Sequence, residues 1–262
     1  MTDLFSLTGK VALVTGGSRG IGLMIARGYV EAGVRVYISS RKAEVCEEIA
    51  AELSTIGFCV ALPADLSTEA ECQRLAAELA AREDRLDILV NNAGIQHVAP
   101  VEDFPIEKWD QIIAINMTSA FHSTRAAVPI MKAQGRGRIV NIASAHALVA
   151  SPFKSAYVTA KHGVLGLTKT VALEVAEHGI TCTAICPGYV KTPLVEAQIA
   201  DQAKARGITE ERVMKDVILA AQPTKKFVEF SQLAGMLLYL VSDAGASVNG
   251  VALSIDGGWT AA

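Results

Sequence analysis

The chain has 262 residues, enough for one large domain or two small ones. Hydrophobic residues make up 51% of the chain and aromatic residues only 5%, a composition that suits helices packed on a buried sheet better than a β-sandwich. The net charge is −3 with no block of like charge, so neither nucleic-acid binding nor membrane-surface binding has electrostatic support.

Residues 1–10 show no signal-peptide pattern, and the sequence has no run of about 18 apolar residues that could span a bilayer. We therefore expect a cytoplasmic protein. The five cysteines are odd in number, form no Cys-x-x-Cys motif and lie at no zinc spacing from a histidine. We expect them to be reduced and structural, and we expect no metal site.

Short apolar runs alternate with longer amphipathic segments along the chain. The runs predict strands at residues 11–14, 34–39, 59–62, 88–90, 138–142, 181–186 and 252–255. The segments between them predict helices, among them residues 20–32, 43–54, 69–82 and 155–178. This alternation predicts a single α/β domain over residues 1–262, with a doubly wound parallel sheet of about seven strands and helices on both faces. Residues 192–222 interrupt the rhythm, and we expect them to form a helical lid over a site.

A glycine-rich segment, Thr15-Gly-Gly-Ser-Arg-Gly-Ile-Gly22, follows the first predicted strand and opens the first predicted helix. Gly16, Gly20 and Gly22 allow a tight turn and let the backbone approach a pyrophosphate, to which the helix offers its N-terminal amides. In this context the segment predicts a Rossmann-type dinucleotide site. The alternative is a tight turn that binds nothing.

The residues at the end of the second predicted strand bear on which dinucleotide is bound. An acid at this point would bind the ribose 2′-hydroxyl of NAD, but the strand ends in Ser39-Ser-Arg41-Lys42. Arg41, Arg19 in the glycine loop and the Ser40 hydroxyl suit a 2′-phosphate instead. We predict that NADP(H) is preferred, with NAD(H) possible; the alternative is that Arg41 and Lys42 are solvated surface charges.

Tyr157 and Lys161 stand four residues apart on a predicted helix and so share one face. A positive charge beside a phenol favours the phenolate and lowers the pKa of the tyrosine toward the range useful for proton transfer. Ser144, at the end of the predicted strand 138–142, could donate a hydrogen bond to the same oxygen. The alternative is a chance pairing on a long helix.

The order and spacing of several motifs resemble the short-chain dehydrogenase/reductase family over essentially the whole chain. These motifs are the glycine loop, Asn91-Asn-Ala-Gly94, Asn116, Ser144, Tyr157, Lys161 and Pro187-Gly188. The resemblance implies that Tyr157 is the general acid/base, that Ser144 holds the reacting oxygen, and that Lys161 binds the nicotinamide ribose. It implies that Asn116 supports a proton-carrying water chain. It further implies a cofactor half over about residues 1–90, a catalytic and substrate half over about 91–262, and a homotetramer.

The same resemblance implies a set of cofactor contacts spread over the carboxyl ends of the predicted strands. They are Gly16, Ser18, Arg19, Gly20, Ile21 and Gly22, then Ser40, Arg41, Asp65, Leu66, Asn92, Ala93 and Gly94, then Tyr157, Lys161, Pro187, Gly188, Val190 and Thr192.

From about residue 91 onward the chain resembles one group within this family, the bacterial 3-hydroxybutyrate dehydrogenases. The matching strings are Gly94-Ile-Gln-His-Val-Ala-Pro100, Ser144-Ala-His146, Pro152-Phe-Lys154, Thr192-Pro-Leu-Val-Glu-Ala-Gln198 and Asp256-Gly-Gly-Trp259. The resemblance implies that a short 3-oxo or 3-hydroxy acid is bound through its carboxylate by Gln96, His146, Lys154 and Gln198, with its reacting oxygen on Ser144 and Tyr157. Tyr189 and Trp259 would close the methyl end. Each of these side chains also has a purely structural explanation.

The first ninety or so residues resemble a different group, the NADPH-dependent 3-ketoacyl reductases, in Phe5-Ser-Leu, the glycine loop and Pro63-Ala-Asp-Leu-Ser67. A recombined gene, or chimera, would explain the two resemblances, and so would one lineage with a drifted cofactor loop. We therefore expect an oxidoreductase for (R)-3-hydroxybutyrate and acetoacetate. The alternatives are a 3-ketoacyl thioester reductase and a dinucleotide-binding sensor without turnover.

Overall fold

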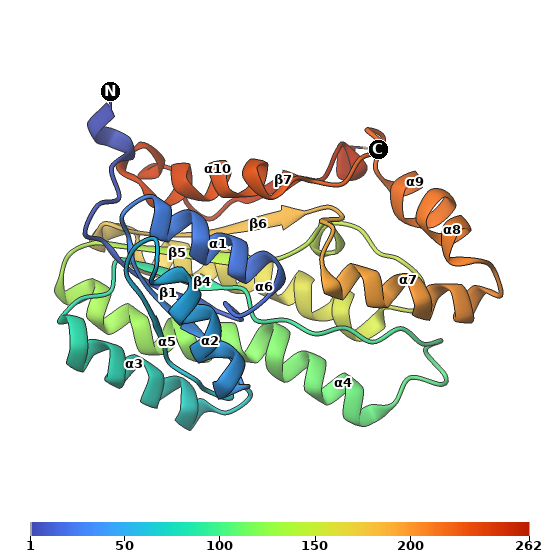
Figure 1. Ribbon diagram of the computed structural model, residues 1–262, viewed down its shortest axis with the longest axis horizontal. Helices are drawn as coiled ribbons and strands as arrows, with labels where there is room; N and C mark the ends of the chain where they lie inside the picture. Colours follow the sequence, from blue (N-terminus) through green and yellow to red (C-terminus); the bar gives the residue numbers. More distant parts are fainter. Residues whose placement is uncertain (1, 262) are drawn as a thin grey trace.

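Seven strands form one sheet in the order β3-β2-β1-β4-β5-β6-β7, and every pairing is parallel (Figure 1). The computed structural model describes residues 2–261, so Met1 and Ala262, the two ends of the predicted domain, lie outside the described residues. The strands are β1 (Val11–Thr15), β2 (Arg35–Ser39), β3 (Cys59–Ala61), β4 (Ile88–Asn91), β5 (Gly137–Ile142), β6 (Ile180–Pro187) and β7 (Ala252–Ile255). Each predicted strand is present, and its ends lie within one residue of the predicted ends.

Helices cover both faces of the sheet, which confirms the Rossmann-type α/β architecture. They are α1 (Gly20–Glu31), α2 (Ala43–Leu53), α3 (Glu69–Glu83), α4 (Ile106–Ile113), α5 (Ser119–Ala133), α6 (Ser155–Val175), α7 (Pro193–Arg206), α8 (Glu210–Arg212), α9 (Leu219–Ala221) and α10 (Phe230–Val241). Two π-helical turns join neighbouring helices, Ala114–Thr118 between α4 and α5 and Val213–Ile218 between α8 and α9. Within residues 2–261, no helix is long and apolar enough to cross a membrane.

The alternation of side chains along β1 shows why its sequence is apolar throughout. Ala12 and Val14 pack in a core cluster with α1, α2 and α10, whereas Val11 and Leu13 pack in a second cluster with α3, α5 and α6. Successive residues of a strand point to opposite faces, so a sheet covered on both sides needs apolar residues at every position. The five cysteines are buried as free thiols in these layers.

The strand order reverses between β1 and β4, which are neighbours in the sheet although β2 and β3 come between them in sequence. In such sheets the crevice outside the carboxyl ends of the strands at the reversal is the usual ligand site. The glycine loop follows β1, and the Asn92–Gly94 loop follows β4. Ser144 and Pro187-Gly188 come at the ends of β5 and β6, so the predicted site residues meet at one edge.

Residues 192–222 are helical, as predicted, and comprise α7, α8, a π-helical turn and α9. They form a small apolar cluster of their own, in which Val195 and Ile199 of α7 pack with Val213 and Ile218. Figure 1 shows this group beyond the carboxyl end of β6. Its far end is fastened by the fully buried Gln222, whose side-chain oxygen accepts a hydrogen bond from the Tyr189 amide.

Candidate active site

The loops after β1 and β4 are joined by several hydrogen bonds. The Thr15 hydroxyl donates to the Val90 carbonyl at 3.2 Å and accepts from the Asn92 amide at 2.9 Å. The Asn92 side chain donates in turn to the carbonyls of Thr15 at 2.9 Å and Gly16 at 3.2 Å. The structure thus brings the glycine loop against the Asn92–Gly94 loop.

This close approach requires glycine at two positions of the loop. Gly16 has φ +65°, and a β-carbon there would lie 2.9 Å from both Ala93 Cα and Asn92 Nδ2. A β-carbon on Gly22 would lie 2.1 Å from the Gly16 carbonyl oxygen. Real β-carbons essentially never approach other atoms within 3.0 Å, so a larger residue at either position would force the two loops to shift.

The N-terminus of α1 faces the same crevice. Its N-cap residue, Arg19, has extended backbone and makes no side-chain cap, and the first turn carries no acid. The leading amides of a helix have no partner within the helix, so these amides of α1 can bind an anion such as a pyrophosphate. Ser18 and Ile21 flank this position in the predicted cofactor set.

The end of β2 carries polar groups without partners. The hydroxyls of Ser39 and Ser40 are buried and have no hydrogen-bond partner among the described residues. Arg19 and Arg41 are exposed, and neither forms an ion pair within residues 2–261. These donors suit the phosphate that the sequence led us to expect.

Two further predicted cofactor residues come after β3. The Ala64 amide donates to the Ser40 carbonyl at 3.2 Å, which brings the start of this loop beside the end of β2. Asp65 is exposed and accepts a hydrogen bond from the Ser67 amide at 3.1 Å, whereas the Leu66 side chain is buried in the core.

The predicted catalytic side chains converge where β5 meets α6. Tyr157 is half-buried on the first turn of α6, and Lys161 is buried one turn later. The Lys161 ammonium lies 5.7 Å from the centre of the Tyr157 ring and donates to the Ile142 carbonyl at 2.7 Å. Ser144 has extended backbone as the N-cap of the short turn Ala145–Ala147, and its hydroxyl accepts from the His146 amide at 3.1 Å.

The electrostatics at Tyr157 differ from the simple expectation of a pKa lowered by Lys161. Burial raises the pKa of Tyr157, and the hydrogen bond with Ser144 opposes this rise. Burial also lowers the pKa of Lys161 to about 8. The physical reason is that desolvation penalises the charged form of each group, the phenolate of Tyr157 and the ammonium of Lys161.

Asn116 lies in the π-helical turn between α4 and α5. Its side-chain oxygen accepts from the Ile95 amide and its nitrogen donates to the Ile95 carbonyl, both at 2.9 Å. Asn116 therefore binds both the amide and the carbonyl of Ile95, the residue between Gly94 and Gln96. Single π turns inside helices are often found at functional sites, and here the turn aims the amide at the loop.

All eight predicted substrate residues line one cavity of about 70 Å³. They are Gln96, Ser144, His146, Lys154, Tyr157, Tyr189, Gln198 and Trp259. The predicted cofactor residues Ile21, Pro187, Gly188, Val190 and Thr192 line it as well. Three further residues line the cavity that the sequence did not lead us to expect, Ala143, Leu194 and Val195. Leu194 and Val195 lie four and three residues before Gln198 on α7, and this helical spacing could have identified them.

Lys154 is the most unusual side chain of this cavity, because it is only 1% exposed. Its ammonium donates to the Gln198 side-chain oxygen at 3.1 Å and to the Tyr189 hydroxyl at 3.4 Å. Burial, together with the nearby charge of Arg206, lowers the pKa of Lys154 to about 8. The side chain still carries its charge at neutral pH, so the cavity can attract an anion.

His146 and Gln96 add neutral polar groups. Burial, and then the charges of Lys154 and His162, lower the pKa of His146 to about 3, so the imidazole is neutral at physiological pH. Its Nε2 lies 2.9 Å from the Ser151 hydroxyl, and its Nδ1 lies 3.4 Å from that of Ser144. The Gln96 side-chain nitrogen is buried with no partner among the described residues, as expected of a donor that serves a ligand.

Aromatic rings close one side of the cavity. Tyr189 and Trp259 stack with centroids 5.2 Å apart, and the His146 ring meets the Trp259 ring edge-on at 4.9 Å. Asp256 fixes the turn that carries Trp259, because its carboxylate accepts from the amides of Gly258 and Thr260, each at 2.9 Å.

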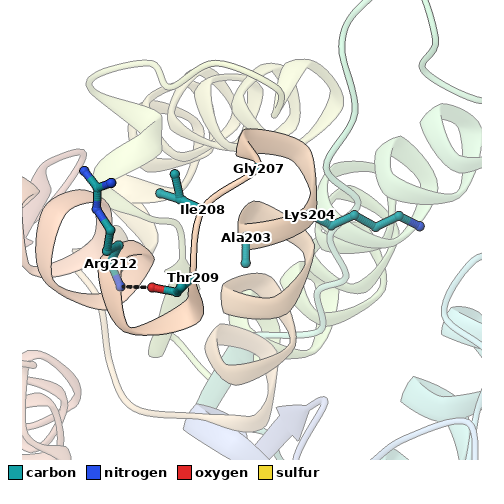
Figure 2. Close-up of a pocket in the computed structure, with 6 residues that line it drawn as sticks. All are labelled: Ala203, Lys204, Gly207, Ile208, Thr209 and Arg212. Carbon is teal, nitrogen blue, oxygen red and sulfur yellow. Dashed lines mark hydrogen bonds between the residues drawn. The ribbon is translucent and has the colours of Figure 1, made fainter.

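A larger hollow of about 490 Å³ lies at the turn between α7 and α8 (Figure 2). It is lined by Ala203, Lys204, Gly207, Ile208, Thr209 and Arg212. The hydrogen bond drawn between these residues joins the Arg212 amide to the Thr209 hydroxyl at 3.3 Å and only caps α8. No predicted catalytic, cofactor or substrate residue lines this hollow, whereas all the predicted substrate residues line the smaller cavity.

Comparisons with known proteins agree with this geometry. The family model described as short chain dehydrogenase matches residues 10–203. The chain is 54% identical to D-beta-hydroxybutyrate dehydrogenase of Rhizobium meliloti over 96% of this chain and 99% of that protein. It is 46% identical to the protein of the same name from Cupriavidus necator, over 97% of this chain and 99% of that protein. Among solved structures, the Pseudomonas aeruginosa RhlG/NADP active-site complex superposes with a TM-score of 0.88 and 37% identity, over 99% of this chain and 100% of that one.

Proposed function

The chain belongs to the short-chain dehydrogenase/reductase family, and we propose that it transfers a hydride between NADP(H) or NAD(H) and (R)-3-hydroxybutyrate or acetoacetate. The single observation that carries this proposal is the make-up of one small cavity. Its lining combines Ser144 and Tyr157, which can hold an oxygen and move a proton, with the buried ammonium of Lys154. A short molecule with an oxygen at one carbon and a carboxylate two carbons away has a partner for each group.

The dinucleotide fits the residues that would hold it. The leading amides of α1 have no partner within the helix and no acid beside them in the first turn, so they can bind a pyrophosphate. When bound, the nicotinamide supplies or accepts the hydride. Lys161 would orient its ribose, and Asn116 would support the proton path, in addition to clasping Ile95.

Tyr157 handles the proton. During reduction its hydroxyl gives a proton to the carbonyl oxygen, and during oxidation the phenolate takes the proton back. Ser144 donates a hydrogen bond to the same oxygen and stabilises the charge that develops on it. The raised pKa of Tyr157 favours the protonated form, which suits the reductive direction.

The carboxylate of the substrate would lie against Lys154, with Gln198, His146 and Gln96 as neutral partners. A hydrogen bond to a charged group contributes roughly 1.5–3 kcal/mol. The stacked rings of Tyr189 and Trp259 would exclude water and limit the length of the alkyl end. A 3-ketoacyl thioester has no free carboxylate at this point and would leave the charge of Lys154 without an anionic partner.

We propose that NADP(H) is the preferred cofactor. Arg41 follows the end of β2 and Arg19 lies in the glycine loop, and neither has an ion-pair partner among the described residues. Two serine hydroxyls at the end of β2 are also buried and unpaired among these residues. The ratio of kcat/KM with the two reduced dinucleotides tests this. A preference for NADH of tenfold or more, about 1.4 kcal/mol, would refute it.

Initial rates with acetoacetate, its methyl ester and an acetoacetyl thioester test the reaction itself. We expect the free acid to have the highest kcat/KM. Faster turnover of the thioester would establish the alternative, a 3-ketoacyl reductase. The sensor alternative predicts no turnover of any member of the panel, and no effect of Tyr157→Phe.

The remaining expectations concern organisation. We propose that the protein is cytoplasmic and that it forms a homotetramer. Light scattering of the purified protein tests the number of subunits. We propose a cofactor half over about residues 1–90, a catalytic half over about 91–262, and a lid over about 192–222. Separate alignments of the two halves against each group of relatives test the chimera hypothesis, which requires their rankings to differ.

A further inference from the structure

Phe153, directly before Lys154, has φ +69°. The left-handed region is unfavourable for a residue with a bulky side chain, and such strain persists only where the surroundings enforce it. The next residue is the buried lysine of the cavity, so the strained backbone sets the direction in which Lys154 leaves the chain.

Two contacts grip Phe153 from different elements. Its carbonyl accepts a hydrogen bond from the Ala99 amide at 3.0 Å, which ties it to the loop that carries Gln96. Its ring lies under the guanidinium of Arg206, whose central carbon is 5.6 Å from the ring centre. A cation over an aromatic face at this distance is attracted by the ring quadrupole.

Arg206 is itself held in place on the last turn of α7. Its Nε donates to the Gln202 side-chain oxygen at 2.7 Å, and Gln202 is 1% exposed. Gln198, Gln202 and Arg206 follow one another at four-residue intervals and so lie on one face of α7. The same face therefore contacts Lys154 through Gln198 and Phe153 through Arg206.

We propose that Arg206 is a positioning residue that holds Phe153 in its left-handed conformation and so directs Lys154 toward the carboxylate of the substrate. This inference rests on the proposed function for its substrate, but the packing that carries it involves the protein alone. Arg206 is not among the residues that line the cavity; it acts through its contact with Phe153 and through its charge near Lys154.

The charges around Lys154 give this role a second signature. The titratable groups that face Lys154 are His146 from the turn after β5, Tyr189 from the loop after β6 and Arg206 from α7. His146 and Tyr189 are neutral near pH 7, because burial lowers the pKa of the first to about 3 and raises that of the second to about 12. Arg206 is the one of the three that carries charge, and its removal should raise the pH at which Lys154 deprotonates.

The test compares Arg206→Met, which keeps the stem and loses the cation, with Arg206→Lys, which keeps a cation. Lys204→Met is the matched control, because Lys204 is an exposed cation on the same helix that lines the separate hollow of Figure 2. The first readout needs no substrate: amide hydrogen exchange at Ala99. We expect faster exchange in Arg206→Met and wild-type exchange in Arg206→Lys and Lys204→Met.

The second readout is kinetic. Arg206→Met should raise KM for acetoacetate about two- to fivefold, with kcat and the KM of the methyl ester little changed. The rise of KM at alkaline pH should begin at higher pH than in the wild type. An Ala99 exchange rate that is unchanged in Arg206→Met, or changed equally by Lys204→Met, would overturn the inference. If the wild-type enzyme did not turn over acetoacetate, the proposed function would be wrong. The role of Arg206 would still be decided by the hydrogen exchange at Ala99, which needs no substrate.

Discussion

Replacing Lys154 with methionine should improve folding stability while it weakens substrate binding. Methionine keeps the length of the stem and removes the ammonium that donates to Gln198 and Tyr189. Loss of a charged hydrogen bond of roughly 1.5–3 kcal/mol should raise KM for acetoacetate about 10- to 150-fold near pH 7. In the wild type KM should rise as the pH passes about 8, where Lys154 loses its proton, and in Lys154→Met this rise should disappear.

The effect on stability follows from the lowered pKa of Lys154. Burial lowers it from 10.5 to about 8, so keeping this 1%-exposed group charged costs the folded state roughly 3 kcal/mol at neutral pH. In the unfolded chain the lysine stays protonated up to about its ordinary pKa. The cost is therefore fully present below pH 8 and is relieved as the pH rises toward 10.5.

Urea unfolding and steady-state kinetics together measure both consequences. We expect Lys154→Met to unfold at higher urea than the wild type at pH 7, with the gap narrowing above pH 8, while the control Lys169→Met on the exposed face of α6 changes neither property. A KM for acetoacetate within about twofold of the wild type would remove Lys154 from carboxylate binding. Lower stability at pH 7 would show that its two hydrogen bonds outweigh the desolvation cost.

Three further predictions concern the rest of the site. Tyr157→Phe should lower kcat about 10²- to 10⁴-fold while titration by fluorescence still detects dinucleotide binding, because only the proton transfer is lost. Arg41→Ala should lower kcat/KM with NADPH about tenfold and leave that with NADH unchanged, since the guanidinium would contact only the 2′-phosphate; equal losses with both dinucleotides would contradict this role. His146 has its pKa lowered from 6.5 to about 3, so the unfolded chain binds a proton there that the folded protein does not, and stability should fall as the pH drops through this range. His146→Gln should remove up to about 1.4 kcal/mol per pH unit of that acid sensitivity in urea titrations between pH 6 and 4.

The strands were predictable because a sheet buried on both faces requires short runs of consecutive apolar residues. In β1 every residue is buried, and all are apolar except the last, Thr15, whose hydroxyl accepts a hydrogen bond from the Asn92 amide in the neighbouring loop. The end of α6 was predicted three residues late, at His178 instead of Val175. The sequence stays helical in character there, and a 3₁₀ turn, Ala176–His178, continues the helix to Gly179 at φ +69°.

The gathering of the predicted side chains was predictable for a related reason, since the carboxyl ends of parallel strands lie at one edge. What the sequence could not show depends on contacts between distant segments. The π turn around Asn116 requires the Ile95 backbone as its partner. The left-handed Phe153 has no local signature, because glycine or asparagine usually marks such a position. The sequence could not show that the pKa of Tyr157 is raised, because this depends on how far the folded chain buries its hydroxyl.

The wall of the cavity formed by Trp259 has a practical consequence for handling the protein. This ring reaches His146 only because Asp256 folds the last turn back toward the sheet. A peptide fused after residue 262 would begin close in sequence to a ring that lines the proposed site, whereas Figure 1 shows the first described helical turn, Thr2–Phe5, at the other side of the fold. An affinity tag should therefore be attached to the amino terminus, and a carboxyl-terminal tag should be cleaved before any kinetic comparison is made.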